Sequence, residues 1–352
     1  VGGLGFVSSL AFPFIGRLAD VLGVRLTALI GQVTLPLAYL AYSMMGGDLS
    51  TYIAIFIVQS VVCVTTTATV YTRLVVQYVE KARGLALAIV VSGAAITGAI
   101  GGPILNEFVE DYGWRASYQA LAIFSVVAGL ITFLMIQSRK ARSEAVAPKR
   151  RAREDYPLIL SSTAFWFFAG AMVLCNLPQT LLLVQLKVLL LENGVDGRAA
   201  AIMFTALSLG MLAGRFVTGV ALDRFSPNRV AFITLALPSL GLFVVASSFD
   251  ATAVLTAAVF FMGFAFGAEG DIVGFLVART FGVQIYGSVM GLLTAIISAS
   301  TSTGALLLSW SLAVTGNFNL FLVGTGISVL VGATLLLFLP DRPVAVPEPK
   351  AA

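Results

Sequence analysis

The sequence predicts an all-α polytopic membrane protein. Of its 352 residues, 59% are hydrophobic and only 11% are charged, and the mean hydropathy is +0.98. A soluble domain is nearer half apolar and a quarter charged. The apolar residues also fall in runs of roughly 20 or more, which is long enough for a helix to cross a hydrocarbon layer of ~30 Å.

Eleven apolar runs are separated by Gly, Pro, Asn, Asp and clusters of charge. They lie at 1–15, 26–46, 52–79, 84–106, 116–137, 158–190, 199–221, 229–248, 252–277, 286–311 and 318–339. Each run is expected to form one transmembrane helix.

Lysine and arginine gather in alternate loops. One set of loops holds Arg17 with Arg25, Lys81 with Arg83, the segment 139–153, Arg224 with Arg229, Arg279, and the C-terminal tail. The opposite set has only Arg115 and Arg198. The positive-inside rule puts the first set in the cytoplasm, so Val1 starts outside. We therefore expect twelve helices, of which the first precedes Val1. These loops also explain the pI of about 9.2, and no nucleic-acid partner is expected.

The longest basic loop divides the chain into two groups of helices. We expect an N-terminal bundle at 1–137 (helices 2–6), a basic cytoplasmic linker at 138–156, a C-terminal bundle at 157–340 (helices 7–12) and a cytoplasmic tail at 341–352. The linker is expected to be flexible and to lie near anionic lipid headgroups.

An internal repeat relates the two groups at an offset of 203 residues. Gly16 corresponds to Gly219, Asp20 to Asp223, and Gly84 to Gly287. Such similarity is typical of transporters built from duplicated halves.

The first copy of the repeat, Gly16-Arg-Leu-Ala-Asp20-Val-Leu-Gly23-Val-Arg25, resembles the signature loop of the major facilitator superfamily. The resemblance implies two six-helix bundles around a midplane cavity and transport by alternating access. It also implies cytoplasmic gating by Asp20, Arg25, Asp223 and Arg229, with Asp20 and Asp223 each near a helix end and near basic loop residues such as Arg25 or Arg229. The second copy departs from the pattern, because Ser226 and Pro227 stand near the place of the second glycine.

A narrower resemblance begins at Arg83-Gly84-Leu85-Ala86 and continues with Arg215 and the segment 267–271. These residues are similar to the monocarboxylate and oxalate–formate branch of the superfamily. The resemblance implies a small organic anion as substrate, coupled to a proton or to another anion.

Five charges lie inside the spans, where each is costly unless it is paired or faces water. They are Arg73, Lys187, Arg215, Glu269 and Asp271. Arg215 is eight residues, or about 12 Å, inward from Asp223, and its repeat counterpart is Phe12. The shared scaffold therefore does not require an arginine there. We expect Arg215 to bind a substrate carboxylate through two parallel hydrogen bonds, and the alternative is a structural ion pair.

Histidine is absent from the chain, so a carboxylate is the natural proton carrier. Glu269 and Asp271 are two residues apart and are expected on different faces of one helix. We predict proton coupling or substrate contact for both. The alternative is an ion pair with Arg215 or Arg279.

Polar residues in two other spans are candidates for the cavity lining. Tyr71 and Arg73 follow a series of threonines, and Asn176 and Gln179 flank Pro178, which interrupts its helix. The threonines can instead bond their own backbone. Lys187 is expected to reach the outer headgroups.

These observations favour a transporter over an enzyme, because no nucleophile–base pair, metal cluster or phosphate loop is visible. No cofactor or metal is expected. We predict a monomeric plasma-membrane carrier that moves a small organic anion, with a proton as a possible second substrate. The alternative is an exporter of drug-like or other neutral solutes.

Overall fold

A computed structural model describes residues 12–14, 17–19, 21–79, 81–135, 152–192, 194–247 and 251–340. All secondary-structure elements in these described residues are helices, and none of the described residues forms a strand. The elements are α2 (Val24–Met44), α3 (Leu49–Val62), η2 (Cys63–Thr66), α4 (Ala68–Tyr78), α5 (Arg83–Met135), α6 (Ala152–Ser161), α7 (Thr163–Asn176), η3 (Leu181–Gln185), α8 (Leu186–Glu192), α9 (Gly197–Arg224), α10 (Pro227–Ala246), α11 (Thr252–Phe281), α12 (Tyr286–Thr315), α13 (Asn319–Leu335) and η4 (Leu336–Phe338).

The expected all-α polytopic fold is confirmed. Within the described residues, eight helices are long and apolar enough to span a membrane, and a bent pair around Ser162 makes up to nine. The number of candidate spans differs from eleven for three reasons. The run at 158–190 is broken, the run at 84–106 passes only as a short apolar helix, and most of the run at 1–15 lies outside the described residues.

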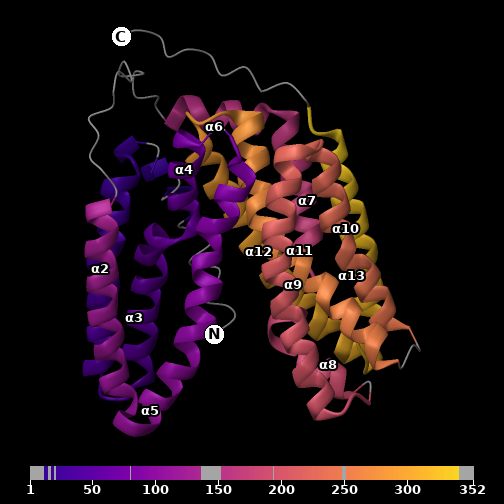
Figure 1. Cartoon of the computed structure of the whole chain (residues 1–352), viewed down its shortest axis with the longest axis horizontal. Coiled ribbons are helices and arrows are strands. Elements are labelled where there is room, and N and C mark those ends of the chain that lie inside the picture. Colours follow the sequence, from indigo (N-terminus) through magenta and orange to yellow (C-terminus); the bar gives the residue numbers. More distant parts are fainter. Residues whose placement is uncertain are drawn as a thin grey trace.

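Element α5 is two helices joined at Gly113. This glycine has φ 79° and ψ 166°, a conformation that a residue with a Cβ rarely adopts. The chain reverses direction there (Figure 1). The predicted runs at 84–106 and 116–137 are its two arms.

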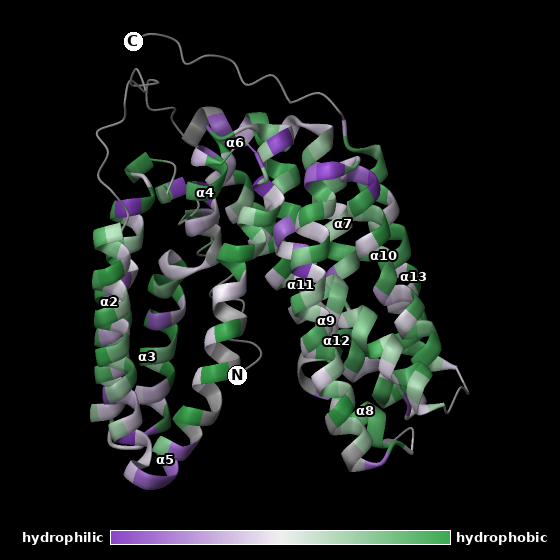
Figure 2. Ribbon diagram, in the orientation of Figure 1, coloured by the Kyte–Doolittle hydropathy of each residue, from purple (hydrophilic) through white to green (hydrophobic). Residues whose placement is uncertain are grey.

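The helices form two groups that meet at one end and diverge toward the other (Figure 1). Elements α2 to α5 make the N-terminal half, and α6 to α13 make the C-terminal half. The halves meet where Arg83, Arg224 and Arg279 lie, which we call the basic end. Hydrophilic residues concentrate there around α4 and α6, while the helices below are mainly apolar (Figure 2).

Two glycines allow the halves to touch at the basic end. A Cβ added to Gly84 on α5 would lie 2.2 Å from the carbonyl oxygen of Gly219 on α9. Only hydrogen fits between these backbones. Leu87, which is fully buried, packs beside Gly274 of α11 one turn further along α5.

Helix α7 ends in mid-span because Pro178 has no amide hydrogen to donate to Leu174. Side chains from neighbouring helices bond the carbonyls at this break. Ser328 of α13 donates to the freed Leu174 carbonyl at 3.0 Å, and Ser300 of α12 donates to the adjacent Val173 carbonyl at 2.5 Å. Two hydrogen bonds from other helices therefore support the break.

Candidate functional site

Within the part of the chain that the structure describes, two membrane-embedded polar clusters stand out, and the first centres on Arg215 of α9 and Asp271 of α11. Asp271 is fully buried, and neither of its carboxylate oxygens has a hydrogen-bond partner. The Nε and Nη1 atoms of Arg215 are also buried and without a partner. The two charges interact electrostatically, but they form no hydrogen bond. A buried cation and a buried anion thus face each other with unused bonding capacity.

This cluster continues across the junction between the halves. Tyr286 of α12 is fully buried and donates a hydrogen bond to the Thr72 hydroxyl of α4 at 3.2 Å. Its hydroxyl is within electrostatic reach of Asp271 and of the buried Arg73. We call Thr72, Arg73, Arg215, Asp271 and Tyr286 the interface cluster.

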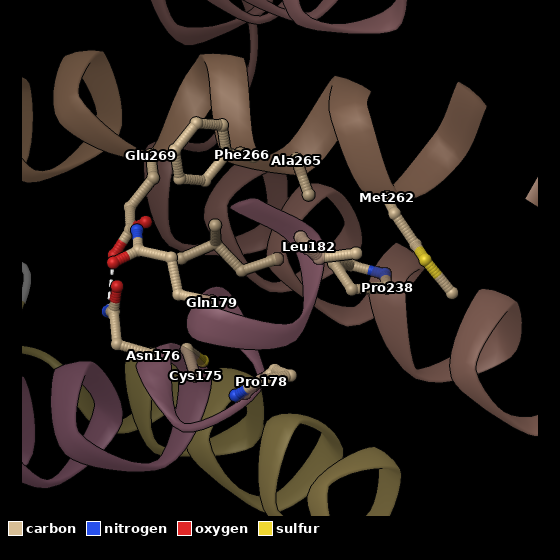
Figure 3. A pocket seen from close by; sticks show the side chains of 11 residues that line it. Cys175, Asn176, Pro178, Gln179, Leu182, Pro238, Met262, Ala265, Phe266 and Glu269 are labelled. Carbon is tan, nitrogen blue, oxygen red and sulfur yellow. Dashed lines mark hydrogen bonds between the residues drawn. The ribbon is translucent and has the colours of Figure 1, made fainter. Parts of the chain in front are cut away.

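The second cluster is a small pocket with a cavity volume of about 30 Å³ inside the C-terminal half, shown in Figure 3. Asn176 from the end of α7 donates from Nδ2 to Glu269 of α11 and to the Met172 carbonyl. The Gln179 side chain extends toward the same end of the pocket (Figure 3). The other lining residues are Cys175, Pro178, Leu182, Leu235, Pro238, Met262, Ala265 and Phe266. We call this site the amide pocket.

The two carboxylates of α11, Glu269 and Asp271, therefore have different surroundings. Asp271 belongs to the interface cluster, whereas Glu269 bonds Asn176. The alternative of an ion pair between Glu269 and Arg215 or Arg279 is wrong for this conformation, because Glu269 has Asn176 as its hydrogen-bond partner among the described residues. The Nη1 atom of Arg279 instead donates to Asn228 at 3.3 Å.

The remaining predicted binding residues are distributed over both halves. Tyr71 lies within the N-terminal half, where its hydroxyl accepts a hydrogen bond from Gln32 at 3.3 Å. Several threonines near it bond their own backbone, as the alternative interpretation expected: Thr65, Thr66 and Thr67 donate to the carbonyls of Val62, Cys63 and Val64. The side chain of Lys187 lies outside the described residues.

Asp223 holds the junction at the basic end. Its carboxylate accepts hydrogen bonds from the backbone amides of Gly84 at 2.8 Å and Leu85 at 3.2 Å. It therefore caps the first turn of α5 in the other half, where a negative charge also complements the helix dipole. This contact agrees with the expectation that Asp223 lies near a helix end, whereas no ion pair between Asp223 and the exposed Arg229 occurs among the described residues.

The first copy of the gate is described only in part. Asp20 lies outside the described residues. Arg25 places its guanidinium 4.3 Å from the centre of the Phe133 ring, a cation–π contact within the N-terminal half. Arg17 forms an ion pair with the buried Asp155 at the start of the C-terminal half, and Tyr156 donates to the Pro13 carbonyl at 3.0 Å.

Tyr286 and Thr72 were not predicted from the sequence. A signal for Tyr286 was present, because it precedes Gly287, the repeat counterpart of Gly84. The hydrogen bond to Thr72 joins residues 214 positions apart, and no local pattern encodes such a contact.

Two helical halves with apolar outer surfaces, closed at one end over buried charges, define a polytopic membrane transport protein. The profile of the Major Facilitator Superfamily matches residues 1–186 and again 168–352. The chain belongs to the major facilitator superfamily and is a multi-pass integral membrane transporter, not an enzyme.

Curated relatives are distant. An MFS-type transporter of Gibberella moniliformis is 24% identical over 310 residues, covering 85% of this chain and 71% of that protein. Monocarboxylate transporter 13 of Rattus norvegicus is 26% identical over 272 residues, covering 75% of this chain and 61% of that protein.

Solved structures share the fold at low identity. The fucose:proton symporter of E. coli gives a TM-score of 0.77 at 13% identity, covering 96% of this chain and 90% of that one. The human organic anion transporter MFSD10 gives 0.68 at 15% identity, covering 95% and 82%.

Proposed function

We propose that this transporter carries a small organic anion of the monocarboxylate type by alternating access, coupled to a proton. The observation that carries the proposal is the Arg215–Asp271 pair, in which a buried guanidinium and a buried carboxylate have donors and acceptors to spare. Two curated relatives named monocarboxylate transporter 13, from rat and from Bos taurus, support this substrate class.

The geometry supports a competition at Arg215. A substrate carboxylate would accept two parallel hydrogen bonds from the guanidinium. Asp271 would then lose the attraction that favours its charged form and would take up a proton. Substrate and proton binding are linked by this exchange, and the linkage is reciprocal.

The junction at the basic end supports alternating access. The Asp223 cap, the Gly84–Gly219 contact and the Arg17–Asp155 ion pair all join the halves there. We infer that the basic end faces the cytoplasm, because its loops carry the excess of arginine and lysine. The described conformation is then closed toward the cytoplasm. The plasma-membrane location and the monomeric state stay predictions.

The proposal is tested by uptake of labelled monocarboxylates, dicarboxylates and neutral solutes into proteoliposomes, with and without a pH gradient. We expect monocarboxylate uptake that the gradient accelerates. Arg215→Lys keeps the charge but loses the planar fork, so the KM should rise about tenfold or more, as for the loss of a charged hydrogen bond worth about 1.5–3 kcal/mol.

The matched control is Arg224→Lys, an exposed arginine at the end of the same helix, which should keep the wild-type KM. Uptake of neutral solutes alone, or an unchanged KM in Arg215→Lys, would refute the proposal and favour the exporter of neutral solutes.

A further inference from the structure

The carboxylate of Glu269 has no counter-charge in the described structure. Its hydrogen-bond partner is the neutral Asn176, and none of the described arginine or lysine side chains forms an ion pair with it. The rest of the amide pocket is mostly apolar. A carboxylate inside a membrane protein is costly unless it is paired, faces water, or binds a proton or a cation.

Asn176 holds a second unused group beside it. The residue is only 1% exposed, and its Oδ1 atom has no hydrogen-bond partner. Its Nδ2 atom lies 2.9 Å from the Met172 carbonyl oxygen and also contacts Glu269. A half-turn of the amide exchanges Nδ2 and Oδ1, so that Glu269, Met172 and Asn176 all present oxygen toward one point.

A second amide lies at the same end of the pocket. The Oε1 atom of Gln179 accepts a hydrogen bond from the Thr301 hydroxyl at 2.6 Å, and its side chain extends toward Glu269 (Figure 3). Carboxylate, amide and backbone carbonyl oxygens are the ligands that hard cations prefer. A proton on Glu269 could be donated to only one acceptor oxygen. A metal cation, in contrast, is coordinated by several oxygens at once.

We propose that the amide pocket binds a monovalent alkali cation, with Na⁺ as its probe. Glu269 supplies the single negative charge, and Asn176 Oδ1 and the Met172 carbonyl supply neutral oxygens. One carboxylate balances one positive charge, which favours a monovalent over a divalent ion.

The position of the site gives the ion a structural role. Asn176 is the last residue of α7 and Met172 lies four residues before it, while Pro238 of α10 also lines the pocket. A bound cation would tie α11 to the free end of α7. Because Arg215 and Asp271 are not among the residues lining this pocket, the inference does not depend on the proposed anion site.

The test is thermal unfolding of the purified full chain without substrate, at one fixed pH and constant ionic strength. Sodium chloride is titrated against potassium chloride and choline chloride. Because a ligand that binds only the folded state raises the Tm, we expect a saturable rise of several degrees with Na⁺ and none with choline.

Glu269→Gln should abolish the rise, and Glu107→Gln, the same change at an exposed carboxylate, should retain it. Asn176→Leu, which removes Oδ1 at similar volume, should weaken it at least tenfold in Na⁺ concentration. Where a variant does not fold, binding of radioactive sodium to the wild-type protein, competed by unlabelled Na⁺, serves as the second measurement.

Three results would overturn the proposal: equal Tm in Na⁺ and choline, a retained Na⁺ response in Glu269→Gln, or, in a parallel pH titration in choline chloride, stabilisation by acid to which Na⁺ adds nothing. The last result would mean that the pocket takes a proton. None of these three results would bear on the proposed binding of a substrate anion at Arg215.

Discussion

Arg215 and Asp271 interact electrostatically, yet the buried Nε and Nη1 atoms of Arg215 and both carboxylate oxygens of Asp271 have no hydrogen-bond partner. A charged group in the membrane interior costs about 2.5–3.5 kcal/mol at a helix centre. Most proteins reduce this cost with direct ion pairs. A pair that stays within electrostatic reach without bonding is poised to accept a third group.

Asp271→Asn tests the proton half of this arrangement. The amide cannot gain or lose a proton, so we expect uphill uptake driven by a pH gradient to disappear while anion exchange continues. The measurement is proteoliposome uptake compared with counterflow at equal pH. Glu107→Gln serves as the control, and an Asp271→Asn variant that still concentrates substrate would show that another group carries the proton.

Helix α7 is broken where the amide pocket forms, and two serines from other helices maintain the break. Ser328 satisfies the Leu174 carbonyl, which Pro178 leaves without its helical donor, and Ser300 donates to the adjacent Val173 carbonyl. Broken helices near the midplane are tolerated only when neighbours supply such bonds.

Replacement of both serines by alanine should lower the Tm, since each buried carbonyl left unsatisfied costs about 1–3 kcal/mol. The measurement is thermal unfolding in detergent. Ser309→Ala is the matched control, because Ser309 is exposed on α12 and bonds only the Ala305 carbonyl of its own helix. An unchanged Tm in the double variant would indicate that water replaces the hydroxyls.

Elements α5 and α9 set the contact between the halves, and Gly84→Ala tests it. The new Cβ would lie 2.2 Å from the Gly219 carbonyl oxygen, so the helices must separate at a cost of about 1–3 kcal/mol. We expect the equilibrium to shift toward opening at the basic end.

The measurement is labelling of a Leu87→Cys variant by a membrane-impermeant maleimide, in a background without Cys63 and Cys175. Labelling should accelerate severalfold or more. Gly93→Ala is the control on the same helix, since a Cβ there meets nothing within 4 Å. Equal rates in the Gly84 variant would contradict a closed junction as the resting state.

At the scale of the whole molecule, closure rests on several separate contacts. The Asp223 cap joins α9 to α5. The Arg17–Asp155 ion pair joins the N-terminal half to α6, the first helix of the C-terminal half. Sites without shared partners usually contribute additively.

The double variant Asp155→Asn, Asp223→Ala should therefore open the basic end more than either single variant. Loss of the cap alone is worth about 1 kcal/mol, or roughly a fivefold change in a two-state ratio. The same Leu87→Cys labelling reports the effect. A double variant that labels no faster than the singles would mean that the two contacts act as one unit.

The sequence by itself determined the class of this protein, because the length and hydropathy of a span are local properties. The all-helical fold, the duplicated halves and the superfamily all follow from apolar runs, loop charges and the Gly16–Asp20 and Gly219–Asp223 repeat. The spacing of Glu269 and Asp271 on different helix faces was also readable, since helical periodicity fixes it.

Only the tertiary structure decided which partner each charge meets. Asp223 caps a helix 138 to 139 residues away instead of pairing with Arg229, and Glu269 meets Asn176 at a separation of 93 residues. Tyr286 reaches Thr72 in the other half. Such contacts depend on how helices rotate and cross, and that packing is set by many weak interactions that no short segment of sequence contains.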